Sequence, residues 1–329
     1  MNRNALMSRR LLPGMLVCAF AFTLAAPEAL SQTPWPSRPV RIIVGFPGGT
    51  TPDIAARALA DGLAKVWGQP VVVEAKPGAG GNVAADFVAK ANDDHTVGVV
   101  INGNLTTARQ LNPKLPYDPT KDLLPVSLIA TAPLVLVAPA DQPTGAAWVA
   151  AARAAGDKWS YGSVGVGSVG HLGVEVIKAA VGNTGAVHVP YNGNPAVITA
   201  MLGAQVQMAL MPPGVALPQV KAGKLQAVGL AGPRSPLAPD VPSLTEVGVR
   251  MNPLEVWVAL VAPATMSKAA QERLARDVPA LVREAETRQR LLAGGWEPQG
   301  TSGSALASRV REETRLLGDV IAARGIKLE

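Results

Sequence analysis

Cysteine is almost absent from this chain, which has a single one, Cys18, among 329 residues. Cys18 lies within the first 31 residues, which we interpret as an export signal that is removed. The mature chain would then have no thiol. Disulfide bonds, cysteine metal ligands and cysteine nucleophiles are therefore all excluded.

Histidine is also scarce, and its three positions, His95, His171 and His188, lie far apart without metal-ligand spacing. The glycine-rich segments 162–165 and 167–170 both lack the residue order of a Gly-x-Ser-x-Gly nucleophile elbow. No Gly-Lys-Ser/Thr follows the glycines, so a nucleotide-binding Walker loop is absent as well. We therefore expect no metal, no cofactor, no catalytic residue and no enzymatic activity.

The chain has no apolar run of membrane-spanning length. Residues 11–26 form an apolar run of about 16 residues, whereas a membrane helix needs roughly 20. The flanking residues are those of a secretory signal peptide: Arg3, Arg9 and Arg10 before the run, and Ala29 and Ser31 after it. We interpret residues 1–31 as a signal peptide and expect a periplasmic protein. The Arg9–Arg10 pair fits both a twin-arginine signal and an ordinary basic start.

Charge is modest and mixed in sign. Without residues 1–31 the chain keeps 27 basic and 23 acidic residues, a net charge of about +4. Aromatic residues make up only 4% of the sequence, and no basic cluster is interleaved with them. Nucleic acid is therefore not an expected partner, although a weak positive field can attract small anions.

Strand-like and helix-like segments alternate from residue 40 onward. The runs 40–44, 71–74 and 97–101 are rich in β-branched residues. Apolar residues recur with helical spacing from Pro52 onward and again over 82–91. The order βαβαβ predicts a parallel sheet with helices on both faces.

A second set of such segments follows residue 133. Strands are expected at 134–138, 160–162, 187–189, 206–210 and 227–230, with helices at 146–155, 171–181 and 195–202. A strand at 256–261 and three helices ending at Arg324 complete the chain. About 298 mature residues suit two lobes better than one core. We expect an α/β protein with two doubly wound lobes and a ligand cleft between them.

The chain is expected to cross between the lobes near 131–133 and to return near 252–253. Lobe 1 would then comprise residues 32–132 and 253–329, and lobe 2 residues 133–252. Two such crossings are typical of hinges around which lobes close.

Two glycine-rich loops are the candidate ligand contacts, at 46–53 and 163–171. Each follows a strand and leads into a helix, the place where open α/β sheets bind ligands. Gly48 and Gly49 let backbone N–H groups approach an anion, which the partial positive charge of a helix N-terminus also favours. Pro52 and a capping Thr50 or Thr51 equally fit a helix start that binds nothing.

Six motifs occur in a fixed order, at 46–57, 68–74 (GQPVVVE), 76–82 (KPGAGGN), 115–122 (LPYDPTKD), 188–191 (HVPY) and 221–225 (KAGKL). In this order they resemble the motifs of the Bug (TctC-type) family, the extracytoplasmic solute receptors of tripartite tricarboxylate transporters. The resemblance covers nearly the whole mature chain. It implies a Venus-flytrap fold of the periplasmic-binding-protein type, a small carboxylate ligand, membrane transporter subunits as partners and a monomeric receptor.

The resemblance also implies site residues by position. Backbone amides and hydroxyls of the two loops would hold the ligand carboxylate, with Asp53 ordering its loop and not touching the anion. The residues carried over are Phe46, Thr50, Thr51, Asp53, Asn102, Asn104, Ser163, Gly167, Ser168 and Tyr191.

The chain departs from the family at residues 207–213 (QMALMPP), where relatives carry acidic and amide residues. A less polar cleft wall favours a plain or aromatic carboxylate over an amino acid. A metabolite sensor that signals to a membrane partner fits the same residues as a transport receptor. An α/β enzyme is the least favoured alternative, because it would need a cofactor fingerprint or an acid–base pair.

Overall fold

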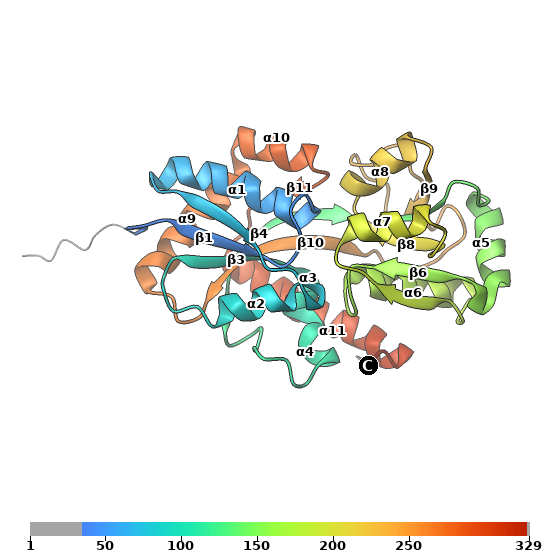
Figure 1. Cartoon of the computed structure of the whole chain (residues 1–329), viewed down its shortest axis with the longest axis horizontal. Helices are drawn as coiled ribbons and strands as arrows, with labels where there is room; N and C mark the ends of the chain where they lie inside the picture. Colours follow the sequence, from blue (N-terminus) through green and yellow to red (C-terminus); the bar gives the residue numbers. More distant parts are fainter. Residues whose placement is uncertain (1–34, 328–329) are drawn as a thin grey trace, which may run out of the picture. The chain divides into compact units, whose positions relative to one another are not determined.

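The computed structural model describes residues 35–327, so the signal peptide expected at 1–31 lies outside the described residues. These residues form two β-sheets of six and five strands, each with helices on both faces (Figure 1). Among residues 35–327, no helix combines the length and the apolarity that crossing a membrane requires.

The six-stranded sheet has the order β11-β4-β10-β3-β1-β2. Its strands are β1 (Val40–Val44), β2 (Val71–Ala75), β3 (Thr96–Ile101), β4 (Leu123–Pro133), β10 (Glu255–Pro263) and β11 (Glu297–Pro298). β1 pairs in parallel with β2 and β3, as the βαβαβ order predicts. β10 runs antiparallel to β3 and β4, because the chain returns from the second sheet along this strand.

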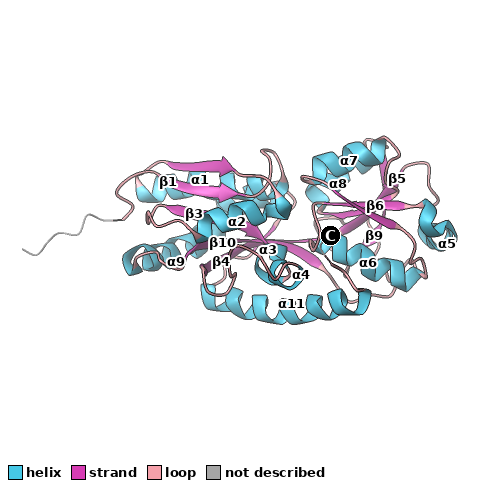
Figure 2. Ribbon diagram, turned by 60° about the horizontal axis from the view of Figure 1, so that its bottom comes forward, coloured by secondary structure: helices cyan, strands magenta, loops and turns pink. Residues whose placement is uncertain are grey.

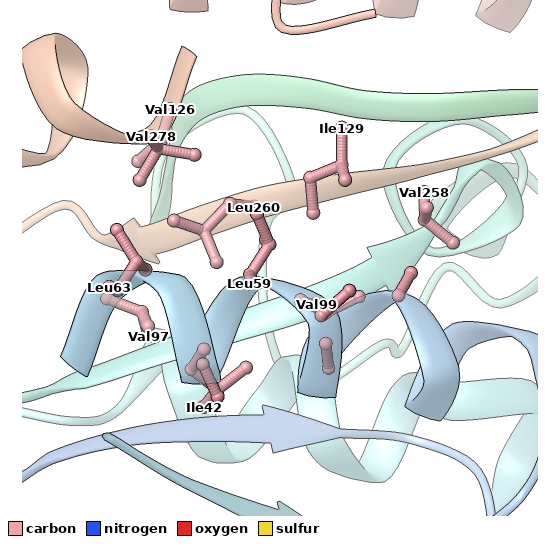
Figure 3. Packing of buried hydrophobic residues seen from close by; sticks show 14 of the residues in the cluster. Ile42, Leu59, Leu63, Val97, Val99, Val126, Ile129, Val258, Leu260 and Val278 are labelled. Atoms are coloured by element: carbon pink, nitrogen blue, oxygen red, sulfur yellow. The ribbon is translucent and has the colours of Figure 1, made fainter. Parts of the chain in front are cut away.

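Helices cover this sheet on both faces. One face packs on α1 (Thr51–Trp67), α9 (Lys268–Arg283) and α10 (Ala285–Ala293). The other packs on α2 (Asn82–Ala89), which follows η1 (Ala79–Gly81), and on α3 (Asn102–Thr106), α4 (Ala108–Leu111) and the first half of α11 (Gly303–Arg324). Consecutive strand residues point to opposite faces, so Ile42 joins the first core and Ile43 the second. Figure 3 shows Ile42 of β1 together with Leu59 and Leu63 of α1 in the first core.

The five-stranded sheet has the order β7-β6-β8-β5-β9. Its strands are β5 (Val135–Pro139), β6 (Ser160–Ser163), β7 (Val187–Pro190), β8 (Met208–Met211) and β9 (Leu225–Leu230). β6 is parallel to β7 and β8, whereas β5 is antiparallel to β8 and β9. One face packs on α5 (Gly145–Ala155) and α6 (Val169–Val181), the other on α7 (Asn194–Leu202) and α8 (Pro213–Lys221), and η2 (Gly156–Lys158) follows α5.

The chain passes from the first sheet to the second between Pro133 and Val135 and returns between Leu230 and Glu255. The C-terminal helix α11 also joins the two sheets. Figure 2 shows this helix running along both parts of the molecule. Its Leu306 packs in a core of the first sheet and its Leu317 in a core of the second. The lobe boundaries at 132/133 and 252/253 stay a prediction.

β4 is an 11-residue strand that we did not expect from the sequence. Pro125 lies within it, and proline cannot donate a bond to a β-ladder. In the structure the pairing of β4 with β10 shifts register next to Pro125, which accommodates the missing N–H.

Candidate ligand-binding site

Loops from both lobes enclose one pocket whose empty volume, opening included, is about 540 Å³. None of its lining residues carries a charge, and most of them are apolar. They are Phe46, Thr50, Thr51, Pro52, Ile101, Asn102, Leu134, Val164, Ser168, Val169, Gly170, Gly193, Asn194, Leu210, Pro212, Val256 and Trp296.

The loop before α1 is ordered by Asp53. This buried carboxylate accepts a 2.9 Å hydrogen bond from the backbone N–H of Gly49 and pairs with Arg57 at 2.8 Å. Gly49 adopts a left-handed conformation with φ of +80°, which glycine tolerates best. Asp53 does not line the pocket, and its charge is neutralised by the ion pair with Arg57.

Thr50 and Thr51 differ in what their hydroxyls do. Thr50 is the N-cap of α1, but its hydroxyl donates to the carbonyl of Pro47 at 2.7 Å and does not cap the helix. The hydroxyl of Thr51 is buried in the pocket wall and has no hydrogen-bond partner. Leaving a buried hydroxyl unpaired costs about 1–3 kcal/mol, so a ligand acceptor at Thr51 would remove that cost.

Trp296 fixes the position of Thr51. Its indole N–H donates a 3.1 Å hydrogen bond to the carbonyl oxygen of Thr51, and its side chain is fully buried. A hydrogen bond from a residue more than 240 positions later in the chain therefore fixes the first turn of α1.

Asn102 follows β3 and is fully buried. Its Nδ2 donates to Glu313 Oε1 at 2.8 Å and to the carbonyl oxygen of Glu255 at 3.3 Å. Its Oδ1 is buried without a hydrogen-bond partner, and Asn102 is one of the residues that line the pocket. Glu313 also accepts a 2.6 Å bond from the indole N–H of Trp257, and burial raises the pKa of its carboxyl.

The second glycine-rich loop leads into α6, whose N-cap is Ser168. The Ser168 hydroxyl donates to the carbonyl of Gly165 at 2.8 Å and accepts from the backbone N–H of His171 at 3.3 Å. The N–H of Gly167 donates to His171 Nδ1 at 3.0 Å. Ser168 lines the pocket, but its hydroxyl proton is already used within the loop.

Two histidines stack behind this loop. The rings of His171 and His188 lie 3.9 Å apart between centroids, and His188 Nε2 lies 2.7 Å from Ser163 Oγ. Burial lowers the pKa of His171 to about 4 and that of His188 to about 3, so both are neutral at pH 7. Ser163 and His188 form a hydrogen-bonded pair, but neither lines the pocket.

Of the ten site residues implied by the resemblance, the pocket wall contains Phe46, Thr50, Thr51, Asn102 and Ser168. The other five, Asp53, Asn104, Ser163, Gly167 and Tyr191, lie outside this wall. Asn104 donates to the carbonyl of Gly80 at 3.0 Å and thereby supports the neighbouring turn. Tyr191 lines an adjoining groove, and its N–H donates to the carbonyl of Ser163.

Several wall residues were not among the predicted ones, notably Trp296, Leu134, Leu210 and Val256. Leu134 and Val256 lie next to the crossings between the sheets. Because these crossings were predicted, the two residues beside them could have been named as site candidates. Trp296 has no local motif that marks it. Leu210 and Pro212 come from the segment 207–213 that departs from the family, and both present apolar surface.

The geometry suits capture of a small anion with an apolar body. Four helices, α1, α3, α6 and α7, have their first residue in the pocket wall, and a helix N-terminus carries about half a positive charge. Within residues 35–327, no group of three or more His, Cys, Asp or Glu side chains is placed to hold a metal ion.

Comparison with known proteins identifies the family. Residues 55–326 match the model described as "Tripartite tricarboxylate transporter family receptor". A UPF0065 protein of Bordetella pertussis is 33% identical over 322 residues, covering 94% of this chain and 97% of the relative.

Solved structures give the same result. MatC of Rhodopseudomonas palustris, determined with bound malate, is 30% identical, with a TM-score of 0.80 over 87% of this chain and 100% of MatC. A second R. palustris protein, determined with adipate, is 28% identical, with a TM-score of 0.84 over 89% of this chain and 99% of that protein. These likenesses confirm the predicted two-lobed α/β fold of the periplasmic-binding-protein type.

Receptors of this family are periplasmic and bind solutes without converting them. The family match covers most of the chain, and the relatives are matched over nearly their full length. The chain therefore belongs to the tripartite tricarboxylate transporter family of receptors, and it is a solute-binding protein and not an enzyme.

Proposed function

We propose that this receptor captures a small carboxylate in the pocket between its two lobes and delivers it to a tripartite tricarboxylate-type transporter. The observation that carries the proposal is the unpaired, buried hydroxyl of Thr51 at the start of α1. A carboxylate oxygen there would accept from this hydroxyl and gain the favourable field of the helix N-terminus.

The relatives support the ligand class. The two R. palustris structures were determined with malate and with adipate, both of them carboxylates. The pocket of this chain is apolar around its few polar groups, which suits a carboxylate with a plain or aromatic body. An amino acid is less suited, because no wall residue carries a charge that could pair with its ammonium group.

We propose different roles for the ten predicted site residues. Phe46, Thr50, Thr51, Asn102 and Ser168 would surround the ligand, since they line the pocket. The other five would position the loops and turns around the pocket through hydrogen bonds, as Asp53 does for Gly49 and Asn104 for Gly80. The lobes, 32–132 with 253–329 and 133–252, would close about the crossings between the sheets.

Residues 1–31 would direct export and then be removed. We propose the membrane subunits of the transporter as partners, with a metabolite-sensing membrane protein as the alternative. Uptake of the radiolabelled carboxylate by cells lacking this gene tests the choice. Lost uptake supports transport, and normal uptake supports sensing.

A thermal-shift screen of the mature protein, freed of ligand by unfolding and refolding, tests the function. A ligand bound only by the folded state adds RT ln(1 + [L]/Kd), about 2.7 kcal/mol at a hundredfold excess over Kd. At least one mono-, di- or tricarboxylate is expected to raise the Tm, whereas divalent metals and dinucleotides leave it unchanged. If dinucleotides or metals raise the Tm and no carboxylate does, the proposed function is wrong.

A further inference from the structure

Two buried polar atoms in the wall of the pocket lack hydrogen-bond partners. They are Thr51 Oγ1, on a residue that is 2% exposed, and Asn102 Oδ1, on a residue that is fully buried. Thr51 begins α1 and Asn102 follows β3, so the two groups come from different elements of the first lobe. A hydroxyl can donate, but an amide oxygen can only accept.

The orientation of the Asn102 amide is fixed by its neighbours. Its Nδ2 lies 3.3 Å from the backbone carbonyl of Glu255, and a carbonyl oxygen can only accept a hydrogen bond. Nδ2 also lies 2.8 Å from Glu313 Oε1. Turning the amide over would set its oxygen against two acceptors, so Oδ1 is the atom left without a partner.

A second layer holds this arrangement. Glu313 Oε2 accepts from the Trp257 indole at 2.6 Å, and Arg309 Nε lies 3.7 Å from the same carboxylate oxygen. Arg309 also pairs with the side chain of Glu255. Because Glu313 and Glu255 together occupy Asn102 Nδ2, only the acceptor of this amide is left, and an acceptor favours a ligand donor over a ligand carboxylate.

The pocket wall therefore contains one unpaired donor and one unpaired acceptor. The donor is the Thr51 hydroxyl at the start of α1, where the helix N-terminus adds positive potential. The acceptor is Asn102 Oδ1, whose own Nδ2 is bound to Glu313. A ligand with only carboxylate and hydrocarbon groups would leave Asn102 Oδ1 unpaired, at the cost of burying a polar group without a partner.

We propose that the ligand is a hydroxycarboxylate, whose carboxylate accepts from Thr51 and whose hydroxyl donates to Asn102 Oδ1. This inference rests on the proposed function and narrows its ligand class. A hydroxyl fits better than an ammonium group, since an ammonium brings three N–H donors and a charge to a wall with no charged residue.

Calorimetric titration with matched ligand pairs tests the inference on the unaltered mature protein. The pairs are lactate and propionate, 3-hydroxybutyrate and butyrate, malate and succinate, and mandelate and phenylacetate, with each enantiomer measured separately. In every pair that binds, one hydroxy enantiomer is expected to bind at least about 10-fold more tightly than the deoxy acid. Equal affinities in all binding pairs overturn the inference and leave the proposed function intact.

Alanine and aspartate extend the panel as the amino analogues of lactate and malate. Tighter binding of an amino analogue than of its hydroxy acid overturns the assignment of the donor as a hydroxyl. If no carboxylate of any kind binds, the proposed function fails, and the present inference fails with it.

Two variants link the preference to Asn102. Asn102→Ala is expected to reduce the hydroxy-to-deoxy ratio to less than about threefold, because the buried acceptor is gone. Asn192→Ala, which removes an exposed amide outside the pocket wall, is the control and should keep the parental ratio. An unchanged ratio in folded Asn102→Ala contradicts the inference, and the titrations of the unaltered protein decide it if that variant does not fold.

Discussion

The hydroxyl of Thr107 donates a 2.8 Å hydrogen bond to the carbonyl oxygen of Gly167. Thr107 lies between α3 and α4 in the first lobe, and Gly167 lies in the loop before α6 in the second. Beside this bond, Gly165 approaches Gly80 so closely that a Cβ on Gly165 would lie 3.0 Å from the Gly80 Cα. The two lobes therefore touch each other next to the pocket.

Thr107→Val is expected to weaken ligand binding by about 2- to 10-fold. The variant keeps the shape of the side chain but leaves the Gly167 carbonyl without its donor, which disfavours closure by about 0.5–1.5 kcal/mol. Calorimetry with the best carboxylate measures the affinity, and small-angle scattering measures the fraction of closed molecules.

Thr314→Val is the matched control for Thr107. The Thr314 hydroxyl donates to the carbonyl of Val310 one turn earlier in α11, so its loss does not involve the contact between lobes. Parental affinity is expected for this control. If Thr107→Val also binds like the parent, its hydrogen bond does not contribute to closure.

Thr51→Val is expected to reduce carboxylate affinity by about 10- to 150-fold, the value of a hydrogen bond to a charged group. Its free energy of unfolding without ligand should stay the same or rise, because the Thr51 hydroxyl is buried and unpaired in the empty protein. Calorimetry and urea unfolding measure the two quantities on the same preparation.

Thr301→Val provides a control of the same kind. Its hydroxyl is also buried without a partner, but Thr301 does not line the pocket. We expect this variant to bind carboxylates normally. A Thr51→Val protein with parental affinity would exclude the Thr51 hydroxyl as a ligand contact.

Ser168→Ala is expected to lower the free energy of unfolding by about 1 kcal/mol, as the loss of an N-cap does. Its affinity should fall less than that of Thr51→Val, because the Ser168 hydroxyl donates to Gly165 and has no proton left for a ligand. Ser302→Ala removes the N-cap of α11 and should give a similar loss of stability with no loss of affinity. A larger loss of affinity for Ser168→Ala than for Thr51→Val would reverse the proposed roles.

The histidine stack should make stability depend on pH between 7 and 5. Burial holds the pKa of His171 at about 4 and that of His188 at about 3, below the value near 6.5 in unfolded chains. The unfolded chain therefore binds protons first as the pH falls. The stabilisation is fully present above about pH 6.5 and is progressively lost below it, by at most about 2 kcal/mol per histidine at pH 5.

Thermal unfolding at a series of pH values measures this effect. The Tm of the parent should fall between pH 7 and pH 5, and that of His188→Gln should fall less over the same range. Parallel curves for parent and variant would show that His188 does not cause the pH dependence.

The sequence predicts those parts of the fold that depend on local pattern. The strand at 40–44 coincides with β1, because its β-branched residues are buried on both faces of a covered sheet. Both glycine-rich loops also lie at the pocket, where strands end and helices begin. β4 was not predicted, because Pro125 interrupts its strand pattern. Its main partner, β10, also lies more than 120 residues away in sequence.

The site is predictable only in outline for a related reason. Thr50 and Thr51 look equivalent in sequence, and only the fold shows that Thr50 bonds to Pro47 while Thr51 is left unpaired. Trp296 reaches the pocket from a distant segment that carries no motif. The orientation of Asn102 likewise depends on Glu255 and Glu313, which the fold brings together from far along the chain.

Calorimetric titration of the best carboxylate ligand beside its primary carboxamide tests the central claim most directly. The two compounds share their size and carbon skeleton, but the amide has no negative charge and offers N–H donors where the carboxylate offers an acceptor. If the donors at the start of α1 hold a carboxylate, the amide should bind at least about 10-fold more weakly. An amide that binds as tightly as the acid would contradict the account of this receptor as a carboxylate-binding protein.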